Sequence, residues 1–231
     1  MGLSSLLLNK LFVGMPPIAI DHQEKEAYER LIQHTDIRAG VASIVYDCPY
    51  PKYRFVAYMA EQKGMLVHGS NNQEITNFET RRQTLYNGKY VNAVFATKDA
   101  IWPIFYAVFN RAKLVGNFRN GCLRIKAHPY RYYFFSLTEQ TISNIPWISG
   151  TLYFLPQQSF VRASSASVYF DEWVSEQEVS PLFKMEVGLE DFPLVSMVTS
   201  HVSEESILKT WLLYKRRLRA KLSGISIGNR H

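Results

Sequence analysis

The stretch that decides the fold reads Met65-Leu66-Val67-His68-Gly69-Ser70, an apolar run that ends abruptly in His-Gly-Ser. We predict a buried strand over residues 65–68. A histidine at the end of such a strand can hold a sugar hydroxyl, and a glycine after it lets a ligand approach the backbone. A purely structural histidine is the other interpretation. The choice between them depends on the rest of the chain.

Upstream of this stretch the pattern favours helices. Residues 21–34 carry acids early and apolar side chains on one face, which is typical of an amphipathic helix. Pro51 suits the first turn of a second helix that extends toward Gly64. Between them, residues 41–46 are β-branched and alternate, which favours a strand before Asp-Cys-Pro-Tyr-Pro breaks it.

Downstream the chain becomes rich in strands. Residues 71–88 are polar and are expected to form a long connection, and residues 93–96 a short buried strand. Thr97 or Asp99 is suited to cap a following helix that runs to about Arg111. Five further strands are expected, separated by Pro, Gly, Asn or Ser: residues 122–126, 130–137, 150–155, 168–173 and 181–187.

The C-terminal region predicts one more helix. Ser203 is the expected N-cap, with Glu204 and Glu205 in the first turn. Helices followed by successive strands indicate an α+β fold with a mostly antiparallel sheet. No Gly-x-Gly-x-x-Gly or Walker sequence is present, so Rossmann and P-loop chemistry are not supported.

Composition places the chain among globular proteins. Its 231 residues are 47% hydrophobic and 14% aromatic, enough to bury a full core as one domain or one domain plus a small appendage. Two cysteines are too few for a disulfide framework, so a reducing compartment is expected. The six histidines are scattered without a His-Glu-x-x-His sequence, and we expect no metal site.

The net charge of +6 is concentrated at the C-terminal end. From Lys209 onward there are seven Lys or Arg and no acid, so the remainder holds 26 − 7 = 19 basic and 20 acidic residues, a net charge of −1. This pattern is typical of a solvated helix whose cations complement the helix dipole. A patch for nucleic acid is the alternative.

The N-terminal residues 1–20 include Ser-Ser-Leu-Leu-Leu but do not read as a signal peptide, because the apolar run is short and no positive charge precedes it. Leu6 also breaks the myristoylation pattern. No run approaches the roughly 18 apolar residues of a membrane span. A soluble, cytoplasmic protein without a membrane partner is therefore expected.

Three segments in order resemble the His-Tyr-Glu arrangement of the ADP-ribosyltransferase superfamily, on its poly(ADP-ribose) polymerase and diphtheria-toxin side. The first is His68-Gly69-Ser70, the second is Val94-Phe95-Ala96-Thr97 with Tyr106 on the helix after it, and the third is Asp171-Glu172-Trp173-Val174 at the join of a strand. The resemblance covers roughly residues 65–187 and is one of short motifs. The chain is also similar to a group of bacterial proteins with the same His-Gly-Ser and Phe-Ala-Thr pattern.

This resemblance implies a role for each residue with NAD as co-substrate. His68 would hold the adenosine ribose, and Gly69 and Ser70 the nicotinamide carboxamide. Tyr106 or Phe95 would stack on the nicotinamide ring. Glu172 would hold the ribose 2′-hydroxyl of the nicotinamide side and stabilise the cation that forms when the glycosidic bond breaks, a role that suits one well-placed carboxylate.

Two arginines are further candidates for ligand contacts, and the chain differs from the family pattern in two places. Arg81 and Arg82, on the connection after His68, are candidates to contact the pyrophosphate as charge-assisted donors. The chain has Val94 where the family pattern has a tyrosine. It has Trp102 and Pro103 where a serine is usual.

The resemblance implies an α+β fold of three parts: an N-terminal helical segment over residues 1–62, a split-sheet ADP-ribosyltransferase-like core over 63–200, and a basic C-terminal helix and tail over 201–231. It implies an enzyme that transfers ADP-ribose to a macromolecule, protein or nucleic acid, or to water. A toxin-like bacterial transferase fits this description. The alternatives are an RNA 2′-phosphotransferase-like NAD-dependent enzyme and a non-catalytic binding module on the same fold.

Overall fold

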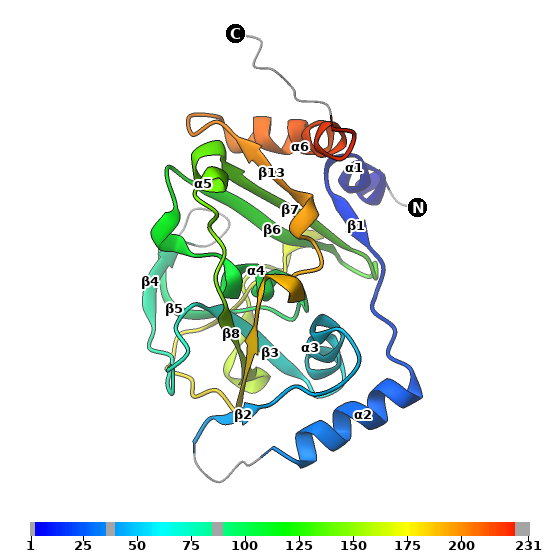
Figure 1. Cartoon of the computed structure of the whole chain (residues 1–231), viewed down its shortest axis with the longest axis vertical. Helices are drawn as coiled ribbons and strands as arrows, with labels where there is room; N and C mark the ends of the chain where they lie inside the picture. The colour runs from blue at the N-terminus through cyan, green and yellow to red at the C-terminus, as the bar shows by residue number, and fades with distance from the viewer. Residues whose placement is uncertain (1–2, 36–39, 85–89, 225–231) are drawn as a thin grey trace.

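The computed structural model describes residues 3–35, 40–84 and 90–224. Within these ranges it contains six α-helices and three separate sheets (Figure 1). The helices are α1 (Leu3–Leu11), α2 (His22–Gln33), α3 (Lys52–Glu61), α4 (Trp102–Val108), α5 (Glu139–Ser143) and α6 (Ile207–Leu222).

The three sheets contain all thirteen strands of the described residues. The first, in the order β1-β7-β6-β10 with β13 also on β7, consists of β1 (Val13–Met15), β7 (Arg131–Thr138), β6 (Phe118–Ile125), β10 (Val168–Phe170) and β13 (Val198–His201). The second consists of β4 (Arg81–Thr84), β5 (Tyr90–Ala96), β11 (Trp173–Ser175) and β9 (Val161–Arg162). The third consists of β2 (Ala42–Ile44), β12 (Phe183–Val187), β8 (Gly150–Pro156) and β3 (Met65–Ser70).

The expected α+β class with mostly antiparallel sheets is confirmed. Among the described strands, only β2 with β12 and β13 with β7 pair in parallel. All other ladders are antiparallel, including the long pairing of β6 with β7 and that of β3 with β8. Antiparallel neighbours need only short connections, which agrees with the closely spaced turn residues in this half of the chain.

Helix α2 forms because its sequence supplies a cap, and a buried carboxylate on it pairs with α3. Asp21 caps α2 by accepting from the Glu24 amide at 2.9 Å, and the Glu24 carboxylate accepts in return from the Asp21 amide. Glu24 is buried and receives two hydrogen bonds from the Arg54 guanidinium of α3, at 2.5 and 2.7 Å. These bonds lower the pKa of Glu24 and tie the two helices together.

The largest core cluster is centred on α4, which lies in the middle of the molecule (Figure 1). Phe105 is fully buried there and contacts three other rings. The distances between ring centroids are 5.3 Å to Phe109, 5.0 Å to Phe135 and 5.9 Å to Phe192. Aromatic pairs at these separations contribute beyond the area that they bury. This packing fixes α4 against β7.

The two ends of the chain pack against each other on the far side of β7. Phe12, just after α1, is 1% exposed and lies 5.0 Å from the ring of Phe134 and 5.7 Å from that of Trp211 in α6. The 1–62 segment also supplies strands to two sheets, because β1 pairs with β7 and β2 with β12. Residues 1–62 are thus interwoven with the 63–200 region.

Several expected elements differ in detail. The connection over 71–88 contains strand β4, and its residues from 85 onward lie outside the described ranges. The strand expected over 168–173 is two strands, β10 and β11, separated by Asp171 and Glu172.

The N-cap of the last helix is Ser206 and not Ser203, because the Ser206 hydroxyl accepts from the Lys209 amide at 3.2 Å. Glu205 therefore precedes the helix. It is buried and accepts two bonds from Arg217, at 2.7 and 2.6 Å, which tie the start of α6 to its third turn.

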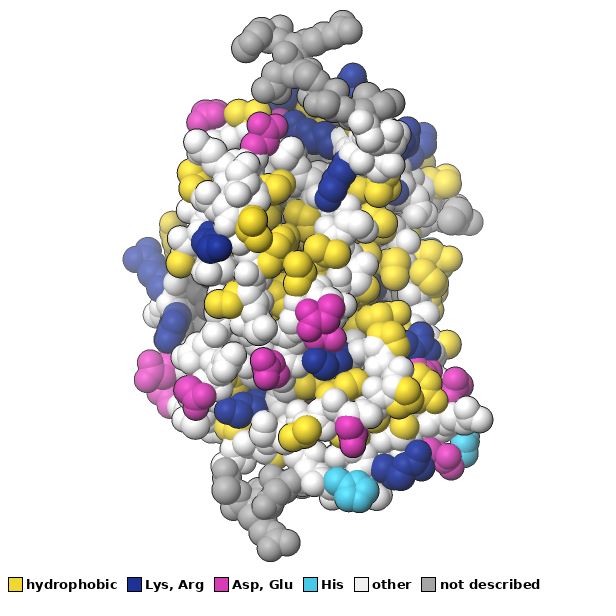
Figure 2. All heavy atoms as spheres, viewed as in Figure 1, with side chains coloured by type: hydrophobic (Ala, Val, Ile, Leu, Met, Phe, Trp, Pro, Cys, Tyr) yellow, Lys and Arg dark blue, Asp and Glu magenta, His cyan; other side chains and the backbone are white. Residues whose placement is uncertain are grey.

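On the face drawn in Figure 2, neither acidic nor basic side chains form one large patch. Hydrophobic side chains gather near its middle, and acidic and basic side chains are mixed around its edges and lower half. In the described part of the chain, no helix is both long and apolar enough to cross a bilayer.

Candidate functional site

A pocket opens where two sheets meet at a single bridge. Val67 of β3 and Thr97, just after β5, exchange two backbone hydrogen bonds of 2.8 and 3.0 Å. Beyond this bridge β3 pairs with β8, whereas β5 pairs with β4 and β11, so the two strands belong to different sheets. The cavity has a volume of about 180 Å³ and is lined by Val67, His68, Gly69, Phe95, Ala96, Thr97, Trp102, Pro103, Tyr106, Arg111 and Glu172.

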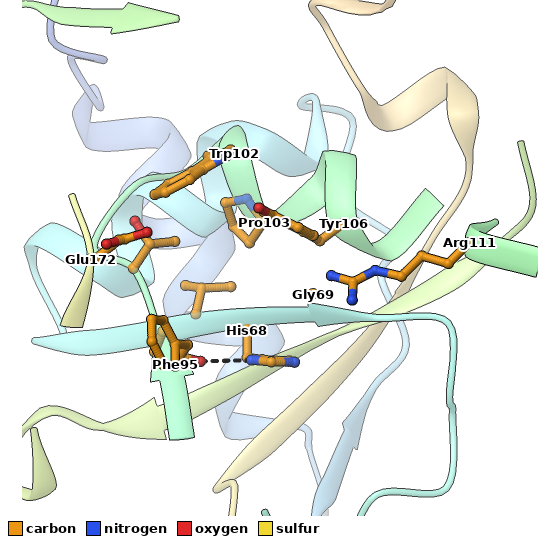
Figure 3. A pocket seen from close by; sticks show the side chains of 11 residues that line it. His68, Gly69, Phe95, Trp102, Pro103, Tyr106, Arg111 and Glu172 are labelled. Atoms are coloured by element: carbon orange, nitrogen blue, oxygen red, sulfur yellow. Dashed lines mark hydrogen bonds between the residues drawn. The ribbon is translucent and has the colours of Figure 1, made fainter. Parts of the chain in front are cut away.

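His68 is held in one orientation by the neighbouring strand (Figure 3). Its Nδ1 donates to the Phe95 carbonyl oxygen at 2.7 Å, and its ring lies 4.7 Å from that of Phe78. Burial lowers the pKa of His68, and the nearby positive charges of Arg111 and Arg81 lower it further. The imidazole is therefore neutral near pH 7, with a proton on Nδ1 and a lone pair on Nε2 that can accept from a hydroxyl.

Gly69 has a structural reason for being glycine. A Cβ atom at this position would lie 1.8 Å from the Pro103 carbonyl oxygen and 2.9 Å from the Ala107 amide nitrogen. Helix α4 therefore packs directly on the backbone of β3, and only a residue without a side chain fits beneath it. The close approach that the sequence suggested for a ligand is made by α4.

The first turn of α4 is fixed by a buried carboxylate. The Asp99 Oδ1 atom accepts from the amides of Ile101 and Trp102 at 2.8 and 2.6 Å, and Oδ2 accepts from the Tyr133 hydroxyl at 2.5 Å. Of the two expected caps, Asp99 holds the helix, whereas the Thr97 hydroxyl accepts from the Asp99 amide. This turn sets the position of the aromatic residues that follow.

Aromatic rings form one wall of the pocket. Trp102 lies 6.0 Å from Tyr106 between ring centroids, and its Nε1 donates to Asn120 Oδ1 at 2.5 Å. Burial raises the pKa of Tyr106, so its hydroxyl is protonated at neutral pH. Phe95 lines the pocket, whereas Val94 points to the other side of the strand and packs in a separate apolar cluster. The departure from the family pattern at Val94 therefore lies outside the pocket lining.

Glu172 reaches the same pocket from a distant part of the chain. Because Trp173 pairs with Ala96, the residue before Trp173 falls at the pocket end of β5. The Glu172 backbone is fixed by two bonds: its amide donates to Phe170 at 2.7 Å and its carbonyl accepts from Ala163 at 2.9 Å. Figure 3 shows its carboxylate on the side of the pocket near Trp102.

Asp171 supports this turn from the opposite face. Its carboxylate is 1% exposed, accepts from Trp173 Nε1 at 3.1 Å and lies 3.4 Å from Arg124 Nη1. Burial raises the pKa of Asp171, and the Arg124 charge opposes that shift. Arg124 is thus occupied by a structural ion pair.

Five of the eight residues that the motifs singled out line this pocket: His68, Gly69, Phe95, Tyr106 and Glu172. Ser70 does not, since its hydroxyl accepts from the Asn72 amide at 3.1 Å in the following turn. Arg81 and Arg82 also lie outside the lining, on the exposed strand β4, where the Arg82 guanidinium covers the Tyr90 ring at 4.4 Å.

The motifs did not identify the other six lining residues as ligand contacts: Val67, Ala96, Thr97, Trp102, Pro103 and Arg111. Arg111 begins the 3-10 helix η1 (Arg111–Lys113) directly after α4. The only sequence signal for it was its place at the end of the aromatic helix. Within the described residues, no cluster of three or more His, Cys, Asp or Glu could hold a metal ion.

Comparison with known proteins gave no match. No protein-family profile, curated protein or solved structure matches this chain significantly. The function is therefore argued from the geometry of the pocket.

Proposed function

We propose that the chain is an ADP-ribosyltransferase-like enzyme that binds NAD and cleaves the bond between nicotinamide and ribose. The supporting observation is that Glu172 and His68, more than a hundred residues apart in the sequence, line one pocket with Phe95 and Tyr106. Cleavage of a glycosidic bond requires a carboxylate in the ligand pocket, whereas a non-catalytic scaffold does not. The non-catalytic module is the less favoured alternative for that reason.

The size and lining of the pocket suit the nicotinamide end of NAD. A cavity of about 180 Å³ takes roughly one six-membered ring. Phe95, Trp102 and Tyr106 supply aromatic surfaces for such a ring, and the rest of the dinucleotide would lie along the opening. In this pose the neutral His68 accepts a ribose hydroxyl hydrogen bond at Nε2.

Glu172 is the residue that we assign to the chemical step. When the glycosidic bond breaks, its electron pair leaves with neutral nicotinamide and the ribose carbon becomes cationic. A carboxylate beside that carbon stabilises the positive charge, and does so most strongly in a partly dry pocket. An acceptor nucleophile, on a macromolecule or water, then forms the new bond to ribose and loses its proton.

The test is cleavage of NAD labelled in the nicotinamide and in the adenine, by the protein alone and with cell extract. We expect Glu172→Gln to lower nicotinamide release on the order of 100-fold, because it removes the charge and keeps the shape. Glu176→Gln is the matched control, since Glu176 is exposed in the next turn. It should leave the rate within about twofold of wild type.

Three other results would count against this assignment. If wild type neither binds nor cleaves NAD, the ADP-ribosyl proposal is wrong. Binding without cleavage in both proteins would identify a binding module. Turnover that requires RNA with a 2′-phosphate would identify the phosphotransferase. That enzyme would need several basic residues converging on a phosphate, but Arg124 is paired with Asp171, and Arg81 and Arg82 lie outside the pocket lining.

A further inference from the structure

Arg111 lines the pocket and has no part in the steps above. Its guanidinium carbon lies 5.4 Å from the centroid of the Tyr106 ring and 5.5 Å from that of Phe118. Two aromatic faces thus hold a planar cation in place without neutralising it. Within the ranges that the structure describes, Arg111 forms no ion pair with a carboxylate.

The pocket is therefore charged at two ends. Figure 3 shows the Arg111 guanidinium on one side and the Glu172 carboxylate on the other, with His68 and Tyr106 between them. His68 is neutral near pH 7, so Arg111 provides the positive end. A ligand that complements both ends carries a cationic group toward Glu172 and an anionic group toward Arg111.

We propose that Arg111 is an anion subsite that binds a phosphate of the ligand and so sets the direction in which the ligand lies in the pocket. The proposal rests on the proposed function, because NAD has the required pattern, a cationic nicotinamide ring joined through ribose to pyrophosphate. An arginine fork can give two parallel charge-assisted hydrogen bonds to phosphate oxygens. Arg111, and not Arg81 or Arg82, is then the residue that contacts the pyrophosphate.

A series of ligands with zero, one and two phosphates tests this assignment. Nicotinamide riboside, nicotinamide mononucleotide and NAD are titrated calorimetrically into wild type, Arg111→Gln and Arg111→Lys at low ionic strength, where charge interactions are least screened. Inorganic pyrophosphate is titrated separately. Arg216→Gln is the matched control, since Arg216 is exposed on α6 and lies outside the lining.

We expect Arg111→Gln to weaken mononucleotide and NAD binding about 10-fold to 100-fold and to leave the riboside within about twofold. Arg111→Lys keeps the charge without the fork and should recover part of the loss. Arg216→Gln should resemble wild type for every ligand. Equal weakening of all three ligands by Arg111→Gln would instead indicate lost packing and would overturn the subsite.

The two proposals fail in different ways. If wild type binds NAD and Arg111→Gln binds it equally well, the subsite is wrong and the proposed function stands. If pyrophosphate binds through Arg111 but no nicotinamide compound binds, the subsite stands and the ADP-ribosyl function is wrong. If neither pyrophosphate nor the mononucleotide binds to wild type, the subsite is overturned.

Discussion

At the scale of single residues, the half-buried His68 and the buried His201 show how the surroundings choose one protonation state. His68 donates from Nδ1 to the Phe95 carbonyl, and the residue lines the pocket. His201, at the end of β13, is 2% exposed and lies between Ser136 and Asn117. The Asn117 amide donates to the Ser203 carbonyl, so its oxygen faces the His201 Nε2 atom at 2.7 Å. His201 is therefore neutral, with its proton on Nε2.

The pKa of His201 predicts a stability that falls in acid. Burial, reinforced by the Arg119 charge, lowers it to about 4, whereas an unfolded histidine has a pKa of about 6.5. Between these values the unfolded chain binds the extra proton. The free energy of unfolding should therefore decrease as pH falls from 6.5 to 4, by up to about 1.4 kcal/mol per pH unit from this group.

His201→Gln isolates that contribution, because glutamine keeps one donor and one acceptor but does not titrate. His68 shifts in the same direction, so the quantity to measure is the difference between wild type and the variant in urea unfolding at pH 7.5 and pH 5. We expect the variant to lose less stability in acid. Parallel pH profiles would contradict the prediction.

Residue-level reasoning from the sequence reached His68 and Glu172 because short motifs carry their own chemistry. It missed Arg111 because nothing local distinguishes that arginine from a solvated one. In the structure its guanidinium lies over the rings of Tyr106 on α4 and Phe118 on β6, at the pocket. It also did not foresee that α4 packs on Gly69, since the approach of a helix is invisible along the chain.

At the scale of elements, α4 packs closely on two neighbouring strands of one sheet, at a glycine in each strand. Besides the contact over Gly69, a Cβ atom at Gly150 of β8 would lie 1.9 Å from the Ala107 carbonyl oxygen. That carbonyl also accepts from the Asn71 side chain at 2.6 Å. The helix that carries Trp102 and Tyr106 is thus seated directly on β3 and β8.

Gly69→Ala should displace this helix. The added methyl group meets backbone atoms of α4, which cannot rotate away, so we expect a loss of about 1–3 kcal/mol in the free energy of unfolding. Ligand binding should weaken as well, because Pro103 and Tyr106 move with the helix. Chemical denaturation followed by fluorescence measures the first effect.

Gly14→Ala is the control for Gly69→Ala. A methyl group there meets the end of the flexible Asn9 side chain at 2.5 Å, which can move aside. Its cost should therefore be clearly smaller. Equal stability of wild type and Gly69→Ala would show that α4 is free to shift away from β3.

Periodicity and turn residues were sufficient for α2, α3 and the long strands, whose hydrophobic patterns are local. They were insufficient for β4 and β13, which are strands only because partners are available. β13 lies alongside β7 over residues 135–138, next to the stretch of β7 that β1 occupies. The sequence predicted Ser203 as the cap of α6, whereas Ser206 caps it and the buried Glu205 precedes the first turn.

At the scale of the whole molecule, α1 and α6 close the structure by meeting over β7 (Figure 1). Phe12 joins them, since it contacts Phe134 in the sheet and Trp211 in the helix. Segments from both ends of the chain therefore share one apolar cluster. This cluster couples the stability of residues that are almost 200 positions apart.

Phe12→Ala should lower the free energy of unfolding by about 3–5 kcal/mol while unfolding remains a single transition. Urea unfolding monitored by circular dichroism and by tryptophan fluorescence checks both points. Leu7→Ala is the control, because Leu7 is 55% exposed and its loss should be small. Two separate transitions in wild type would show that the 1–62 segment unfolds independently.

The bridge between Val67 and Thr97 has a mechanical consequence for the whole molecule. At the pocket, the two sheets meet along a seam of two backbone hydrogen bonds, beside the one that His68 makes to Phe95. A ligand held by His68 on one sheet and by Glu172 on the other spans that seam. If the ligand binds only when the two sheets are joined, its binding free energy adds to the free energy needed to separate them. A tighter ligand should therefore make the separation of the two sheets more costly by the same free energy.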